Sequence, residues 1–244
     1  RRLICSDFFE EGRTGFDAES DVASYDLVVG NAPWGAGVVT PIALKWANAG
    51  DREWSIPNKD IGGLFLVKAA HLVKPTGKIA MIQSANSLLF NASKTAEQFR
   101  KKLFFTYRVD EIYNLSALRF KVFKRKSHTT KTSIAPACVV IMGGVPPAVD
   151  DRISYISPKH LKPLVDEFTI IIEPHDRRSI SVNEALGDNN IWATLMWGSA
   201  RDRVLLKKLK LFSTLLSPGE DITVRHRQGI NYGDRTRPAP QLCN

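Results

Sequence analysis

The sequence predicts an α/β fold built on a mostly parallel sheet. Short apolar runs rich in Val and Ile alternate with helix-length segments, and turn residues bound the runs. The runs expected to form buried strands are Arg2–Cys5, Tyr25–Gly30, Lys78–Gln83, Val109–Asn114 and Ala137–Met142. An alternation of strands and helices is typical of a parallel sheet that is covered by helices.

Two segments between these strands are expected to be helices. Ile61–Val73 has apolar residues at helical spacing and stops before Lys-Pro-Thr-Gly at 74–77, which is a clear breaker, and Lys94–Phe105 is the second helix. A later helix is expected over Ala200–Leu216. After the prolines at 146 and 147 the chain becomes more acidic. We therefore expect one domain at 1–149 and, at 150–244, an α+β connector that leads into another module.

The composition is that of a globular protein. Of the 244 residues, 43% are hydrophobic and 24% are charged, and no apolar stretch reaches the length of a membrane span. The three cysteines are widely spaced, which argues against a disulfide framework or a zinc cluster. These features predict a protein of the reducing cytoplasm that makes no contact with a membrane. The sequence begins at Arg1 without an initiator Met or a signal-peptide pattern, so we expect a fragment of a longer protein.

The positive charge is concentrated in one segment. The chain has a net charge of +9, and within residues 119–131 two aromatic residues interleave with six cations beside hydroxyl groups. Cations neutralise phosphates and rings stack on bases, so this segment predicts a nucleic-acid partner. The side chains expected to contact phosphates are Lys121, Lys124, Arg125, Lys126 and Lys131. A solvated charged face is the alternative interpretation of such a run.

A polar tetrapeptide follows the strand expected at 25–30. Asn31, Ala32, Pro33 and Trp34 stand just beyond its carboxyl end, where ligand sites gather in open α/β sheets. The Asn31 side-chain oxygen and the Ala32 carbonyl could accept the two protons of a planar amino group, while Trp34 could stack on the heterocycle that carries it. Pro33 restricts the backbone before it. The alternative is an ordinary strand-ending turn with a packing Trp.

The order of these motifs resembles that of N6-adenine DNA methyltransferases. The resemblance is carried by Cys-Ser-Asp-Phe-Phe-Glu at 5–10, the segment 25–35 with Asn-Ala-Pro-Trp, Gly63–Lys68, Gly77–Ile82 and the strand after Val122 and Phe123. It covers roughly residues 2–143 and is strongest for the type I and type IIG restriction-modification kind and related phage-defence systems. It implies a Rossmann-like S-adenosylmethionine-dependent methyltransferase sheet, of which this chain is the C-terminal part.

The resemblance also implies residue roles. Asp7 would accept a hydrogen bond from the adenine amino group of S-adenosyl-L-methionine, with Phe8 packing beside it. Asn31 and the Ala32 carbonyl would hold the amino nitrogen of a flipped adenine, Trp34 would stack on that base, and Phe123 would face it from the other side, with Phe120 as its nearest rival. The methyl group would pass directly to nitrogen, so no metal and no covalent nucleophile is expected; Cys138 is expected in the core.

The chain departs from the family's pattern in two ways. Position 32 is Ala where the family has Pro, so looser positioning and slower turnover are expected. No Gly-rich cofactor turn precedes Leu3, and Gly35–Gly37 comes too late to replace it. The expectation is therefore a fragment that binds the cofactor poorly alone. Near the other end, Ile222–Gly233 weakly resembles the entry to a target-recognition domain, and a basic loop is the equal alternative.

Three functions remain open on the sequence. The first is site-specific methylation of adenine N6 in double-stranded DNA, in a bacterial or archaeal restriction-modification system with a restriction or specificity module in the same or another chain. The second is an amino or amide methyltransferase that acts on RNA or on protein glutamine. The third is a catalytically inactive DNA-binding subunit.

Overall fold

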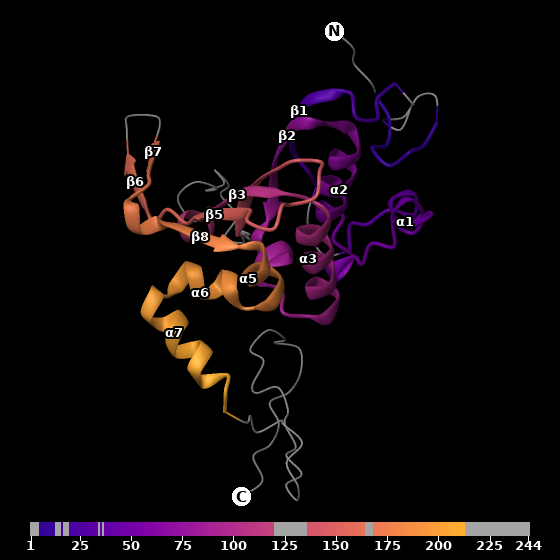
Figure 1. Ribbon diagram of the computed structural model, residues 1–244. Helices are drawn as coiled ribbons and strands as arrows, with labels where there is room; N and C mark the ends of the chain where they lie inside the picture. Colours follow the sequence, from indigo (N-terminus) through magenta and orange to yellow (C-terminus); the bar gives the residue numbers. More distant parts are fainter. Residues whose placement is uncertain are drawn as a thin grey trace, which may run out of the picture. The chain divides into compact units, whose positions relative to one another are not determined.

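The computed structural model describes residues 5–12, 16, 20–33, 35, 37–119, 136–163 and 168–212. The chain divides into two compact units, Arg1–Ala200 and Arg201–Asn244. The first holds the sheet and its helices, shown in Figure 1. The helix α7, Ala200–Leu209, agrees with the first part of the helix expected at 200–216, and residues after 212 lie outside the described part.

The described part of the first unit contains one six-stranded sheet in the order β1-β2-β4-β3-β5-β8. The strands are β1 (Tyr25–Asn31), β2 (Val73–Ser84), β3 (Val109–Asn114), β4 (Ala137–Met142), β5 (Arg152–Ile156) and β8 (Arg177–Ser181). Their pairings make β1, β2, β3 and β5 run in one direction, with β4 and β8 reversed. The predicted α/β class is confirmed, and the reversal of β4 makes both of its own pairings antiparallel.

Helices cover one face of this sheet. They are α1 (Pro41–Ala47), α2 (Gly62–Leu72), α3 (Lys94–Thr106), α5 (Val182–Gly187) and α6 (Ile191–Trp197), with short turns η1 (Pro57–Lys59), η2 (Asn86–Phe90), η3 (Ser116–Leu118) and η4 (Pro174–Asp176). A separate hairpin, β6 (His160–Pro163) with β7 (Phe168–Ile171), projects from the sheet in Figure 1. The helices expected at 61–73 and 94–105 are confirmed as α2 and α3.

Alternation along β2 separates a buried face from a more open one. Ile79, Met81 and Gln83 are buried, whereas Ala80 and Ile82 between them are only partly buried. The edge strand β1 continues the open face, because Leu27 and Val29 are 59% and 67% exposed. Successive side chains on a strand point to opposite faces, so by alternation Asn31 shares the open face with these two residues.

The sheet continues past the boundary expected at residue 149. β5 pairs in parallel with β3, and the buried Asn114 side-chain amide donates to the Tyr155 hydroxyl at 2.6 Å. Trp192 of α6 is fully buried and packs against Phe104 and Tyr155. The strands β5 and β8 and the helix α6 therefore share the core of the preceding residues. The expected change near residue 150, from a catalytic domain to a connector that leads into another module, stays a prediction.

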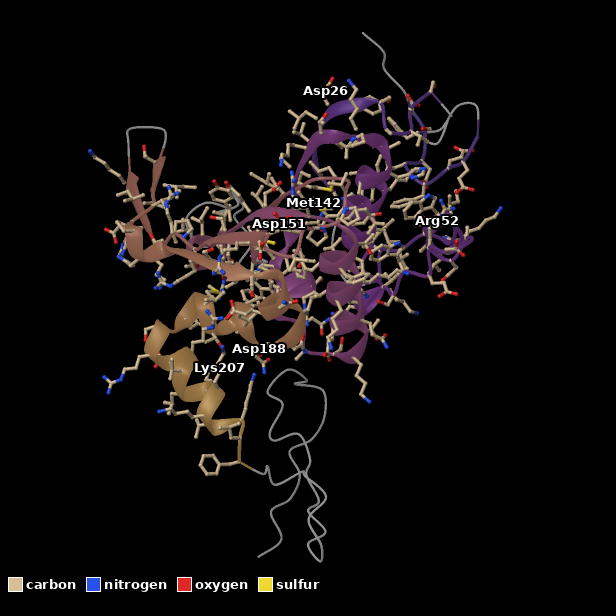
Figure 2. The ribbon with its side chains drawn as sticks, viewed as in Figure 1. Asp26, Arg52, Met142, Asp151, Asp188 and Lys207 are labelled. Carbon is tan, nitrogen blue, oxygen red and sulfur yellow. The ribbon has the colours of Figure 1, made fainter. Side chains whose placement is uncertain are left out.

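The breaker expected at 74–77 lies within β2 as a bulge. Tyr25 pairs with Val73 and Leu27 pairs with Lys78, so four residues of β2 stand opposite Asp26 alone. Asp26, labelled in Figure 2, accepts from Lys74 Nζ at 2.7 Å. A Cβ at Gly77 would lie 2.9 Å from the carbonyl oxygens of Tyr25 and Asp26. Only glycine fits beneath these carbonyls, which explains why the segment Lys-Pro-Thr-Gly at 74–77 ends in glycine.

Replacing Gly77 by Ala is expected to destabilise the protein. The new methyl group would force β1 and the bulge apart, at a cost of about 1–3 kcal/mol in the free energy of unfolding, measured by urea denaturation. Gly187→Ala is the matched control, because a Cβ there would meet nothing within 4 Å. Equal unfolding midpoints for the two variants would contradict this account of the bulge.

Cys138 is fully buried in β4, as the sequence predicted, and burial raises the pKa of its thiol. A raised pKa leaves little reactive thiolate near neutral pH, while Cys5 is exposed. We expect iodoacetamide at pH 8 to label Cys5 rapidly and Cys138 only after denaturation, as measured by mass spectrometry of the peptides. Labelling of both cysteines at similar rates in the native protein would place Cys138 outside the core.

Candidate functional site

The residues expected to hold the methyl acceptor lie at the carboxyl end of β1. Asn31 is the last residue of the strand, is exposed, and pairs with Ile82 of β2. Ala32 is buried at 5% exposure, and Pro33 is exposed. Burial of Ala32 restricts the backbone that follows the strand. Trp34 lies outside the described residues.

Asp7 and Phe8 lie in a short turn that is closed by the Asp7 side chain. Its Oδ1 atom accepts from the Phe9 backbone N–H at 2.8 Å, and its carbonyl accepts from the N–H of Glu10 at 3.2 Å. Asp7 and Phe8 are partly buried. A carboxylate accepts at both oxygens, so the local bond does not exhaust its hydrogen-bonding capacity.

Aromatic packing attaches this turn to α2. The ring of Phe8 stacks on Phe65 with centroids 4.8 Å apart and planes inclined by 6°, while Phe9 meets Phe65 edge-on at 5.0 Å. Phe9 is 1% exposed, belongs to the same hydrophobic core as Ala32, and Phe8 packs against that core. The two predicted parts of the site, at 7–8 and at 31–33, are thus connected by one core.

Lys68 of α2 is a functional candidate that the sequence argument missed. It is fully buried, and its Nζ lies 5.6 Å from the ring centroids of Phe8 and Trp46 and 5.7 Å from that of Phe9. Such distances are those of cation–π contacts. The sequence contained a signal for Lys68. It stands four residues from both Leu64 and Leu72, so it lies on the apolar face expected for this helix.

An ion pair supports the same region. Arg52, labelled in Figure 2, donates from Nη2 to Glu11 Oε1 at 2.6 Å, and its guanidinium carbon lies 4.7 Å from the centroid of the Trp46 ring. The turn that contains Asp7 is therefore attached to α1 as well as to α2.

A small cavity with polar and apolar walls lies near the carboxyl end of β2. Asp60 accepts from the Gly62 N–H at 3.0 Å through Oδ1 and from the Ser87 hydroxyl through Oδ2, and Gln83 is 2% exposed. The cavity measures about 10 Å³, the space of a single water molecule. Its residues are Pro57, Asp60, Gly63, Gln83, Ser87, Leu88 and Phe99. The two bonds of Asp60 thus join the start of α2 to η2, which follows the end of β2.

A larger hollow, of about 550 Å³, lies at the opposite edge of the sheet. Phe105 at the end of α3, Val149 before β5 and Leu186 of α5 line it. Because β3 and β5 begin at that edge and β1 ends at the other, this hollow is remote from Asn31.

The remaining predicted site residues lie outside the described residues. These are Phe123 and the cations Lys121, Lys124, Arg125, Lys126 and Lys131, together with Phe120. Their roles at the target base and at phosphates stay predictions. In the described part of the chain, no helix is long and apolar enough to cross a bilayer.

Comparison with solved structures places the fold among restriction-modification methyltransferases. A type I restriction-modification methyltransferase subunit from Streptococcus thermophilus aligns with a TM-score of 0.55 and 16% sequence identity, over 78% of this chain and 41% of that chain. The type IIG restriction endonuclease BpuSI aligns over 79% of this chain and 23% of its own, with 17% identity and a TM-score of 0.49. This chain spans less than half the length of either protein. At such identity the likeness concerns the fold alone.

A sequence comparison gives the family resemblance. The model of the Eco57I restriction-modification methylase family matches residues 5–123, just under half of the chain. No curated protein matches the chain. The matched range contains Asp7, Phe8 and the tetrapeptide at 31–34, which carry the resemblance in the sequence. Over residues 5–123 the chain therefore matches the restriction-modification methylases, as the sequence predicted.

Proposed function

We propose that the protein containing this chain transfers a methyl group from S-adenosyl-L-methionine to the N6 amino group of an adenine flipped out of double-stranded DNA. The observation that carries the proposal is the position of Asn31-Ala32-Pro33 at the carboxyl end of β1 in a chain that matches restriction-modification methylases. We further propose that the protein acts in restriction-modification in the cytoplasm, with a restriction or specificity module in the same or another chain.

The residues at 7–8 fit the adenine ring of the cofactor. Asp7 offers a partly buried carboxylate as an acceptor for an exocyclic amino group, and Phe8 offers an aromatic surface beside it. When bound, the cofactor supplies an electrophilic methyl group on a sulfonium centre. The role of this chain would be to bind and orient the purine through Asp7 and Phe8.

The residues at 31–33 fit the acceptor amine. The Asn31 side-chain oxygen and the Ala32 carbonyl would accept its two protons, which shifts electron density toward nitrogen and aims its lone pair. The buried Ala32 and the rigid Pro33 limit the motion of that carbonyl. Flipping costs a few kcal/mol of unstacking, which Trp34 and Phe123 would offset by stacking.

Removing the Asn31 side-chain amide is expected to abolish turnover while cofactor binding persists. In the full natural protein, Asn31→Ala should lower tritium transfer to DNA by on the order of 100-fold or more, because one oriented partner of the reacting group is lost. Asn183→Ala, on the exposed surface of α5, is the matched control and should retain activity.

The same assay, offered DNA, RNA and protein acceptors, separates the competing functions. Label in DNA that is lost with Asn31→Ala supports the proposal. Label only in RNA or protein would favour the amino or amide methyltransferase. Absence of both cofactor binding and transfer would favour an inactive DNA-binding subunit.

Trimming the ring at position 8 is expected to weaken cofactor binding. Phe8→Leu in the full natural protein should raise the Kd of S-adenosyl-L-methionine about fivefold, since one aromatic contact contributes about 1 kcal/mol. Phe105→Leu is the control, because Phe105 is 73% exposed at the end of α3. The measurement is isothermal titration calorimetry, with thermal unfolding to verify that both variants fold. An unchanged Kd for Phe8→Leu would remove Phe8 from the proposed cofactor site.

A further inference from the structure

Three potential metal ligands gather in the turn η4 between β7 and β8. They are Glu173, His175 and Asp176, and one donor atom from each lies within 4.8 Å of the others. The His175 Nε2 atom lies 3.0 Å from Glu173 Oε2 and 3.8 Å from Asp176 Oδ1. None of these residues belongs to the site proposed for methyl transfer.

Asp176 provides a second and independent observation. Its side chain is fully buried, and its Oδ1 atom has no hydrogen-bond partner in the described part of the chain. The separation of 3.8 Å from His175 Nε2 is too long for a hydrogen bond. A buried carboxyl oxygen without a donor is costly, and coordination of a metal ion is one way to satisfy it.

The backbone holds this oxygen in place. Asp176 Oδ2 accepts from the Glu173 N–H at 3.0 Å, and the Asp176 N–H donates back to the Glu173 carbonyl at 2.9 Å. The Asp176 carbonyl accepts from the N–H of Ser157, the first residue after β5, at 3.0 Å. The turn is therefore fixed to the sheet, and Oδ1 faces the imidazole across the cluster.

We propose that Glu173, His175 and Asp176 bind a divalent first-row transition-metal ion, of which Zn²⁺ is the best match. His175 Nε2 lies 3.0 Å from the Glu173 donor and 3.8 Å from the Asp176 donor, so at about 2.1 Å from a common ion these two pairs would subtend angles of about 90° and 130°, which bracket tetrahedral geometry. One imidazole with two carboxylates favours Zn²⁺ over Mg²⁺ or Ca²⁺, which prefer oxygen ligands alone. Water would complete the coordination.

The location indicates what the ion would do. The turn η4 joins the β6–β7 hairpin to β8, at the sheet edge where β1 and β5 also end. Five strand spacings separate β8 from β1, or about 24 Å, so the ion would not contact an acceptor held by Asn31. It would instead fix the base of a hairpin that exposes His160 and Lys162.

Calorimetric titration of ZnCl₂ into the metal-stripped chain, with a non-chelating reductant, tests the site. His175→Gln removes the imidazole at a position where its side chain is 60% exposed, and Asp176→Asn keeps an acceptor for the Glu173 N–H. His160→Gln is the matched control, because His160 is an exposed histidine outside the cluster. Thermal unfolding without metal verifies that each variant folds.

We expect one saturable Zn²⁺ site in the wild type, and we expect the control variant His160→Gln to retain it. Its Kd should rise at least about tenfold in His175→Gln and in Asp176→Asn, since even outer partners of a metal ligand contribute that much. Zn²⁺ should raise the Tm of the wild type and of His160→Gln more than that of the two site variants. No saturable site, or equal Kd values for His175→Gln and His160→Gln, would overturn the proposal.

Discussion

The packing of aromatic rings around the buried Lys68 holds the candidate site together. An ammonium group is costly to remove from water, and the rings of Phe8, Phe9 and Trp46 compensate by presenting their electron-rich faces at 5.6–5.7 Å. These rings come from the turn that contains Asp7 and from α1, while Lys68 itself belongs to α2. One side chain therefore gathers three segments that are distant in sequence, and the position of Asp7 relative to the sheet depends on it.

Much of the fold could be predicted because the buried residues of strands and helices recur at regular spacing in the sequence. The strands at 109–114 and 137–142 have the predicted bounds, and α2 and α3 differ from the prediction by a residue at their ends. The spacing of apolar residues does not encode the spatial order of the strands, so the position of β4 between β2 and β3 could not be predicted from it. The proline pair at 146 and 147 indicated a boundary, yet hydrogen bonding of Asn114 to Tyr155 joins the residues on both sides of it.

The candidate site was predictable only where a short motif coincides with a strand end. Asn31 and Ala32 satisfy that condition, and Asp7 was found through its resemblance to a family motif. Asp60 and Gln83 were missed, because a polar residue is notable only once its burial is known, and burial depends on contacts between distant segments. Lys68 was missed although its spacing from Leu64 and Leu72 places it on the apolar stripe of α2. Trp34, Phe123 and the basic segment stay predictions, since they lie outside the described residues.

The bulge at Gly77 determines which face of the sheet carries the acceptor motif. Side chains alternate along a strand, so sliding β1 by one residue against β2 would carry Asn31 from the open face to the face covered by helices. The bulge prevents such a slip, because its four residues fit opposite Asp26 and Gly77 alone fits beneath the neighbouring carbonyls. The bulge of β2 beside the start of β1 thereby determines toward which face the side chain at the end of β1 points. An insertion or deletion of one residue in β1 between Asp26 and Asn31 would turn the acceptor motif to the other face while leaving every strand intact.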